Sequence, residues 1–289
     1  MARKLSKIAK ELNISIGSIV NFLTANDYQC EENPNKKIKE INKIFKLTNR
    51  TMNNLFKEFN ISSRRKNRYI LNEYFFDTID NELKAYLLGY LFADGFVGDE
   101  KYNNIVFSQK IEDAEAVELF KKAIEYTGKL RIFKPGVSSF NNCSDQVAIN
   151  FSSEHMSKTL RNYGLTKKEF YNNFPKLNDE LTRHFVRGFF DGDGSITLTR
   201  SYYKDKIYYG GALDIIVNKN LVNFFLNLFN NIHFTLDQSK TDYMIYLKNH
   251  SKKNMKLFYD YFYKDSKYFL SRKKKKFDEI IGRINGEIQ

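Results

Sequence analysis

Two aspartates, Asp94 and Asp193, occupy the same place in two stretches of closely similar design. The stretches read YLLGYLFADGFV and FVRGFFDGDGSI, and each ends its nine-residue core with Asp-Gly. A single Asp-Gly after a helix is usually a turn with a capping aspartate, but matching copies with matching downstream order favour a shared site. Paired carboxylates are hard oxygen ligands for Mg²⁺, or for another hard cation such as Mn²⁺. A cation held between them could support hydrolysis of a phosphodiester.

The apolar helices that would carry these aspartates each contain a glycine, Gly89 and Gly188, at the third position of the core. A glycine inside a helix costs about 1 kcal/mol relative to alanine. Its presence in both copies therefore predicts that the two helix backbones pack closely together. Such packing would bring Asp94 and Asp193 side by side at the helix ends.

The cores LLGYLFADG (residues 87–95) and VRGFFDGDG (residues 186–194) resemble the LAGLIDADG motif of homing endonucleases. The resemblance covers about residues 69–284. It implies that the motif helices form the interface between two halves and that the penultimate acidic residues, Asp94 and Asp193, are catalytic. Because each half carries one motif, it also implies a monomer that works on double-stranded DNA without a second chain.

The same resemblance indicates four further site residues. It places polar residues at the end of the second strand of each half, at Gln109 and Asn218, and basic residues beside each scissile phosphate, at Lys168 and Lys273. Each has a second interpretation from the sequence. The amides could cap the loops before the following helices, and the lysines could simply be solvated.

The composition favours a polyanionic partner. The chain of 289 residues has a formal net charge of +13 and contains 19 Tyr and 26 Phe. Nucleic acid is the first expectation, whereas a merely lysine-rich surface is the alternative. The length allows two or three units of ordinary domain size.

The chain has two cysteines and four scattered histidines. These are too few and too widely spaced for a disulfide framework or a Cys/His metal cluster. Neither the amino terminus nor any other stretch has an apolar run long enough to span a membrane, and no targeting signal is seen. The sequence therefore predicts a protein without a membrane partner. It would be cytoplasmic, and associated with the nucleoid if the host is a bacterium or a phage.

Residues 1–68 have the spacing of a tandem helix-turn-helix region followed by a basic linker. Apolar side chains recur at helical intervals with breaks near Ser15 and Thr48, each a suitable N-cap. Their second helices could present polar side chains to DNA, or the units could serve packing or protein contact. The residues predicted to bind DNA here are Asn49, Arg50, Asn53, Lys57, Arg64 and Arg65.

After each motif helix the pattern predicts the same order of strands and helices, so the fold class is α+β. Two pseudo-symmetric αββαββα halves with saddle-shaped antiparallel sheets are expected after the small all-α region. The predicted boundaries are 1–68 for the amino-terminal region, 69–163 for the first half, 164–178 for the linker and 179–289 for the second half. One end helix of the second half would span residues 272–284.

The strand after the second motif alternates between apolar and polar side chains. Ile196 and Leu198 would face the core, and the opposite face is rich in hydrogen-bonding groups with little charge. Such a face suits the reading of base edges, although a solvated sheet face has the same pattern. The residues predicted to bind DNA on this strand are Thr197, Thr199, Ser201 and Tyr203.

These observations predict a site-specific endonuclease that hydrolyses both strands of DNA with a divalent metal between Asp94 and Asp193. Two rivals share the fold: a DNA-binding regulator that does not cut, and a splicing helper (maturase) that binds intron RNA. Retention of both aspartates argues against the regulator. A basic groove that follows phosphates does not by itself separate RNA from DNA.

Overall fold

The computed structural model of the chain describes residues 69–133 and 145–286. The predicted helix-turn-helix region and its candidate DNA contacts (Asn49, Arg50, Asn53, Lys57, Arg64 and Arg65) lie outside the described residues. The described part is α+β, with two four-stranded antiparallel sheets, as predicted. None of its helices combines the length and the apolar character needed to cross a bilayer.

The first half begins with the first motif helix and ends with a short helix after its fourth strand. Its strands pair in the order β1-β2-β4-β3. The elements are α5 (Glu82–Asp94), β1 (Gly95–Val97), β2 (Asn104–Lys110), η1 (Ile111–Asp113), α6 (Ala114–Ala123), β3 (Arg131–Phe133), β4 (Gln146–Ser152) and α7 (Glu154–Asn162).

The second half repeats this order, with α10 (Lys252–Tyr263) in the place of α7, and adds one helix, α11 (Ser271–Asn285), at its end. A short 3-10 turn, η2 (Lys168–Phe170), lies between the halves, and the strands pair in the order β5-β6-β8-β7. The elements are α8 (Asp179–Asp193), β5 (Gly194–Tyr203), β6 (Lys206–Asn218), η3 (Lys219–Leu221), α9 (Val222–Leu228), β7 (Thr235–Gln238), β8 (Met244–Asn249), α10 (Lys252–Tyr263) and α11 (Ser271–Asn285).

Both motif helices begin and end by the same local chemistry. Asn81 and Asn178 are the N-caps, and their side chains accept hydrogen bonds from first-turn amides at 3.1 and 2.9 Å. Each helix then runs directly into a strand through the glycine of Asp-Gly. A Cβ on Gly95 would lie 2.5 Å from the Leu91 carbonyl oxygen, so this turn has no room for a side chain. The catalytic candidates are thus fixed where helix becomes strand.

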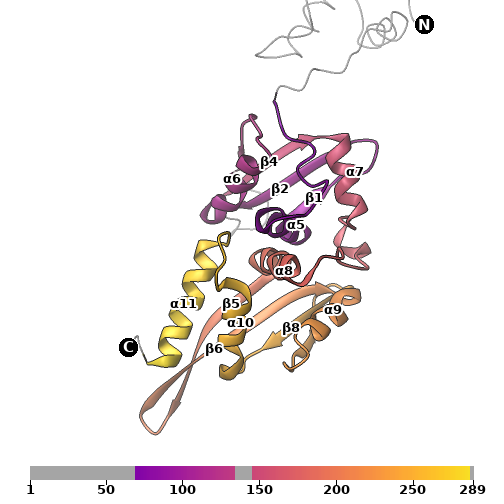
Figure 1. The fold of residues 1–289 in the computed structure, drawn as a ribbon. Coiled ribbons are helices and arrows are strands. Elements are labelled where there is room, and N and C mark those ends of the chain that lie inside the picture. Colours follow the sequence, from indigo (N-terminus) through magenta and orange to yellow (C-terminus); the bar gives the residue numbers. More distant parts are fainter. Residues whose placement is uncertain (1–68, 134–144, 287–289) are drawn as a thin grey trace, which may run out of the picture. The chain divides into compact units, whose positions relative to one another are not determined.

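The two motif helices pack backbone to backbone. A Cβ built on Gly89 would lie 1.8 Å from the carbonyl oxygen of Phe185, and one on Gly188 would lie 1.9 Å from that of Tyr86. Figure 1 shows α5 and α8 side by side between the two sheets. The close packing predicted from the paired glycines is therefore confirmed.

Aromatic side chains fill the space around this seam. Phe92 of α5 packs against Phe185 of α8 with ring centroids 5.3 Å apart, and Phe174 from the connecting segment lies 4.9 Å from Phe185. The three rings come from the first half, the second half and the segment between them. Their burial ties the halves into one core.

The strand after the second motif alternates only in its first part. Ile196 is buried and Leu198 is half-buried, whereas every residue from Thr199 to Tyr203 is exposed. The exposed residues include those predicted to bind DNA, Thr197, Thr199, Ser201 and Tyr203. The β5–β6 pair also extends beyond the rest of its sheet, because β8 pairs only with residues from Leu213 to Asn218. The end of this hairpin projects as a two-stranded arm (Figure 1).

A buried arginine joins the middle of α8 to the first residue of α5. Arg187 of α8 is 0% exposed. Its guanidinium donates to the carboxylate of Glu82 on α5 at 2.7 Å, and to the carbonyls of Phe262 and Tyr268 at 3.1 and 2.8 Å. Arg187, at the second position of the core VRGFFDGDG, therefore joins α8 to α5, to the end of α10 and to the chain between α10 and α11.

We expect Gly89→Ala and Gly188→Ala to lower stability even though alanine is the better helix former. The added methyl would overlap a backbone carbonyl that cannot rotate away, so overpacking of about 1 to 3 kcal/mol should outweigh the propensity gain. Thermal denaturation would measure the loss. Gly210→Ala is the control, since its Cβ would meet only the movable Thr199 hydroxyl, at 2.9 Å. Wild-type melting temperatures in both seam variants would refute the close-packing account.

We expect Arg187→Met to destabilise the protein strongly, because two carbonyls would lose their donor and Glu82 would lose its cationic partner at 2.7 Å. Glu82 would keep the amides of Lys267 and Tyr268 as donors. Loss of one partner of a buried ion pair typically costs about 3 to 5 kcal/mol. The control is Lys256→Met, which removes an exposed pair with Asp260 at 2.8 Å and should cost less than about 1 kcal/mol. Urea unfolding would give both free energies. A similar cost for the two variants would contradict the role given to Arg187.

Candidate active site

The two aspartates meet where the motif helices end. The Oδ2 atom of Asp94 accepts a hydrogen bond from the Gln109 amide at 2.9 Å. The same oxygen would lie 2.9 Å from a Cβ on Gly192, the residue before Asp193. The Asp94 carboxylate therefore faces the end of α8 that carries Asp193.

Asp193 is held by a lysine from the segment between the halves. The Nζ atom of Lys168, on η2, donates to both oxygens of the Asp193 carboxylate, at 2.8 and 2.6 Å. Burial raises the pKa of Asp193 to about 7, with Lys168 acting in the opposite direction and Asp94 adding to the rise. The charge of Asp94 thus opposes ionisation of Asp193, whereas the charge of Lys168 favours it.

Asn218 reaches the site through the backbone of that segment. Its amide donates to the Lys168 carbonyl oxygen at 2.7 Å, and its Oδ1 atom accepts from the amide nitrogen of Asn220 at 2.9 Å. It therefore supports the turn that carries Lys168 and also caps the turn that follows β6. The contact with Asn220 fits the loop-capping interpretation, and the contact with the Lys168 carbonyl fits the interpretation as a site residue.

The two amides are not equivalent by strand register. Gly95 pairs with Phe107 and Gly194 pairs with Ile215. Gln109 lies two residues beyond Phe107, and the residue two beyond Ile215 is Val217. Because side chains alternate along a strand, Asn218 points to the opposite face from the one that Gln109 uses.

Lys273 lies beneath the aspartates. It projects from the first turn of α11 and is 6% exposed. Its ammonium donates to the carbonyls of Phe190 at 2.7 Å and Gly192 at 3.4 Å, and also to that of Gly194. Burial lowers the pKa of Lys273 to about 8. A positive charge at the carbonyl end of α8 is favourable for the helix dipole.

Asp191 is a buried carboxylate of the site that the sequence analysis did not identify. It accepts hydrogen bonds from the hydroxyls of Tyr86 at 2.9 Å and Tyr263 at 2.7 Å, and from the amide nitrogen of Leu270 at 2.7 Å. Burial raises the pKa of Asp191. The signal in the sequence was the contrast at the sixth motif position, where the first copy has Phe92.

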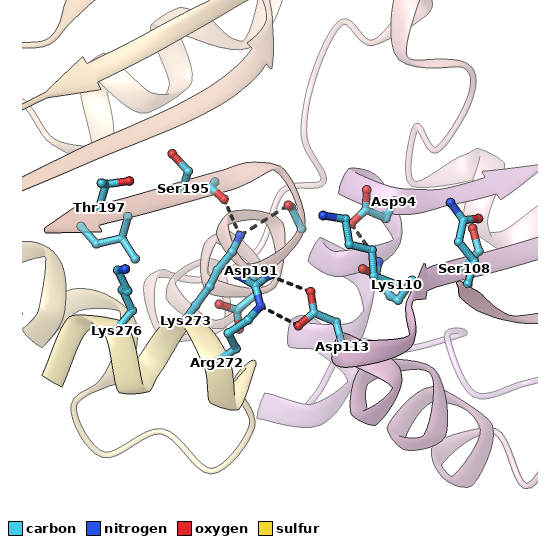
Figure 2. A pocket seen from close by; sticks show the side chains of 15 residues that line it. Asp94, Ser108, Lys110, Asp113, Asp191, Ser195, Thr197, Arg272, Lys273 and Lys276 are labelled. Carbon is cyan, nitrogen blue, oxygen red and sulfur yellow. Dashed lines mark hydrogen bonds and ion pairs between the residues drawn. The ribbon is translucent and has the colours of Figure 1, made fainter. Parts of the chain in front are cut away.

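Asp94, Gln109, Asp191 and Lys273 line an open cavity of about 670 Å³. Asp193, Lys168 and Asn218 do not line it. Figure 2 shows Asp94 and Lys110 on one side, and Lys273 and Lys276 on the other. Thr197 is the predicted DNA-binding residue that lines this cavity, while Thr199, Ser201 and Tyr203 continue outward along the exposed face of β5. The lining comes from both sheets, both motif helices and α11: Asp94, Ser108, Gln109, Lys110, Asp113, Gln146, Asp191, Gly192, Gly194, Ser195, Ile196, Thr197, Arg272, Lys273 and Lys276.

The residues present fit a hard divalent cation. Asp94 and Asp193 offer oxygen ligands, and a cation between them would relieve the repulsion that contributes to the raised pKa of Asp193. In the described ranges no group of three or more His, Cys, Asp or Glu comes together. Waters and phosphate oxygens would therefore complete the coordination shell.

Comparison with solved structures places this arrangement in a known fold. The I-LtrWI LAGLIDADG homing endonuclease, solved with its target DNA, matches with a TM-score of 0.50 and 14% identity, over 73% of this chain and 91% of that chain. The meganuclease I-AabMI matches with 0.49 and 12%, over 72% and 91%. I-SmaMI matches with 0.46 and 14%, over 72% and 99%. The likeness to I-LtrWI shows that the chain has the fold of the LAGLIDADG homing endonucleases.

Comparison by sequence reaches less far. No protein-family model matches the chain. The uncharacterized protein MJ0314 of Methanocaldococcus jannaschii is 27% identical over 143 residues, which are 50% of this chain and 51% of that protein. The chain thus spans about half the length of the curated relative it matches.

Proposed function

We propose that the protein is a site-specific endonuclease that hydrolyses one phosphodiester bond on each strand of double-stranded DNA. The observation that carries this proposal is the convergence of Asp94 and Asp193 across a seam of two tightly packed glycines. The nearby charge of Asp94 disfavours ionisation of the partly buried Asp193, and a bound cation would relieve that repulsion. A fold that keeps both at the ends of its central helices is therefore suited to metal-dependent chemistry.

The surroundings of the aspartates support the same reaction. A bound divalent cation, Mg²⁺ or Mn²⁺, supplies activation of the attacking water and neutralisation of charge on the phosphate. The ammonium of Lys168 contacts Asp193. We propose that it pairs with a phosphate oxygen once DNA is bound. Gln109 orients the Asp94 carboxylate through a hydrogen bond of 2.9 Å.

The choice of DNA as the substrate is supported by the surfaces beside the site. The exposed face of β5 presents hydroxyls that can donate to or accept from base edges. The net charge of +13 suits a polyanion. The structural neighbour I-LtrWI is bound to target DNA. We propose that this chain binds DNA in the same manner, as a monomer.

The first experiment is the selection of cleaved sites from a random duplex library with Mg²⁺ present. We expect one preferred target, cut on both strands. Cleavage of no DNA in the library, with Mg²⁺ or with Mn²⁺, would overturn the proposal. Preferential binding of structured RNA by the same protein would instead favour the splicing-helper alternative.

On the selected target, we expect Asp94→Asn and Asp193→Asn to abolish double-strand cleavage while DNA binding persists, because each removes one anionic metal ligand and leaves the fold intact. Gel assays would follow cleavage, and binding would be measured with Ca²⁺ in place of Mg²⁺. Asp265→Asn is the matched control, since Asp265 is exposed with φ 57°, a conformation that asparagine also adopts. Normal cutting of both strands by either site variant would rule out the paired-carboxylate mechanism.

We also propose that residues 1–68 add affinity rather than the choice of the cut position. Deleting them should weaken binding and reduce its salt dependence, because the region is rich in lysine and arginine. Titrations at several salt concentrations and mapping of the cleaved phosphate would test this. A truncated protein that folds but cuts at a different phosphate would show that the region belongs to the catalytic assembly.

A further inference from the structure

The first turn of α11 is held by carboxylates that belong to other helices. This turn reads Ser-Arg-Lys-Lys, so the acidic residues that stabilise a helix N-terminus must come from elsewhere. The amide nitrogen of Leu270 donates to Asp191 of α8 at 2.7 Å. The amide nitrogen and hydroxyl of Ser271 donate to Glu115 of α6 at 2.6 and 2.8 Å.

The next residue, Arg272, makes the strongest of these contacts. Its Nε and Nη2 atoms donate to the two oxygens of Asp113 at 2.8 and 2.7 Å, a bidentate geometry (Figure 2). Asp113 ends η1, just before α6, and is 4% exposed. Three consecutive residues of the second half are therefore fixed by carboxylates, two of which belong to the first half.

The residue that follows them is Lys273. Its ammonium reaches the carbonyls at the end of α8, next to Asp193. We propose that Asp113 and Glu115 are positioning residues, which hold the start of α11 so that Lys273 stays inserted beneath the catalytic aspartates. The role in cleavage rests on the function proposed above, whereas the placement of Lys273 does not.

The helix does not need these two carboxylates in order to pack. Phe277 and Ile280 on α11 are fully buried, and the helix lies against β5 and β6 of its own half. Removing Asp113 or Glu115 should therefore leave α11 folded on the second half and loosen only its first turn. That separates a positioning role from a general structural one.

The test measures how accessible Lys273 is in the full chain. Asp113→Asn and Glu115→Gln keep the shape of each side chain and remove its charge. Brief acetylation with an amine-reactive ester, followed by mass spectrometry, should show Lys273 protected in the wild type and modified several-fold faster in both variants. Exposed Lys256 is the internal reference. Asp278→Asn is the matched control, because it removes the partner of Lys274 (2.9 Å) from the same helix and should leave Lys273 protected.

The second measurement is single-turnover cleavage of the selected target. We expect Asp113→Asn and Glu115→Gln to lower the rate at saturating DNA by about tenfold to a hundredfold, the usual effect of a misplaced group, with the half-saturating DNA concentration unchanged. Since Glu115 is exposed, its variant keeps the test valid if Asp113→Asn does not fold.

Three outcomes separate the ideas. Unchanged protection of Lys273 in Glu115→Gln and in folded Asp113→Asn overturns the positioning role, whether or not the protein cuts DNA. Faster acetylation with a normal cleavage rate overturns the link between position and catalysis. A wild-type protein that cuts no DNA overturns the proposed function, while the acetylation result still decides where Lys273 is held.

Discussion

The contact between the backbones of α5 and α8 is the constraint on which the rest of the structure depends. With a Cβ on Gly89 only 1.8 Å from a carbonyl oxygen, the helices can approach this closely only because both positions lack side chains. The approach sets the separation of the helix ends, and the helix ends carry Asp94 and Asp193. The following glycines then start β1 and β5, so the same contact also fixes where the two sheets begin relative to the aspartates.

Although the halves repeat, the seam does not make the two aspartates alike. Asp94 accepts a hydrogen bond from the neutral Gln109 amide of its own half. Asp193 is instead paired with the ammonium of Lys168, from the segment between the halves. Beneath them, Lys273 binds the end of α8, and its helix is anchored on the first half. The site as a whole therefore draws groups from both halves and from the segment between them. The repeat gives both halves the same arrangement of helices and strands. The side chains that differ between the copies give each aspartate its own hydrogen-bond and charge partners.

The sequence predicted what depends on local pattern. The motif glycines, the alternation in the first part of β5 and the helical spacing of α11 each need only neighbouring residues to be recognised. The short strands β1 and β7, of 3 and 4 residues, are too brief for a periodic signal. The partners of Arg187 and Asp191 could not be predicted because they lie 72 to 105 residues away in the chain. Strand register is also hard to predict from sequence. The register counterpart of Gln109 is Val217, and a shift of one residue, to Asn218, moves the side chain to the other face of the strand.

Two charged residues of the second motif helix carry the largest electrostatic consequences. Arg187 stands at the second motif position, where the motif has alanine, and Asp191 stands at the sixth, where the first copy has Phe92. Both are buried in the same helix, one turn apart. Each is satisfied by hydrogen bonds: Arg187 by Glu82 and two carbonyls, Asp191 by two hydroxyls and an amide. Burying such groups is tolerated only when their partners are held in place. Both bind the chain between α10 and α11, so the second motif helix orders the loop from which α11 starts. Two sets of contacts thus set the position of Lys273. Asp191 of α8 binds the residue before α11, and Asp113 and Glu115 of the first half bind its first two residues.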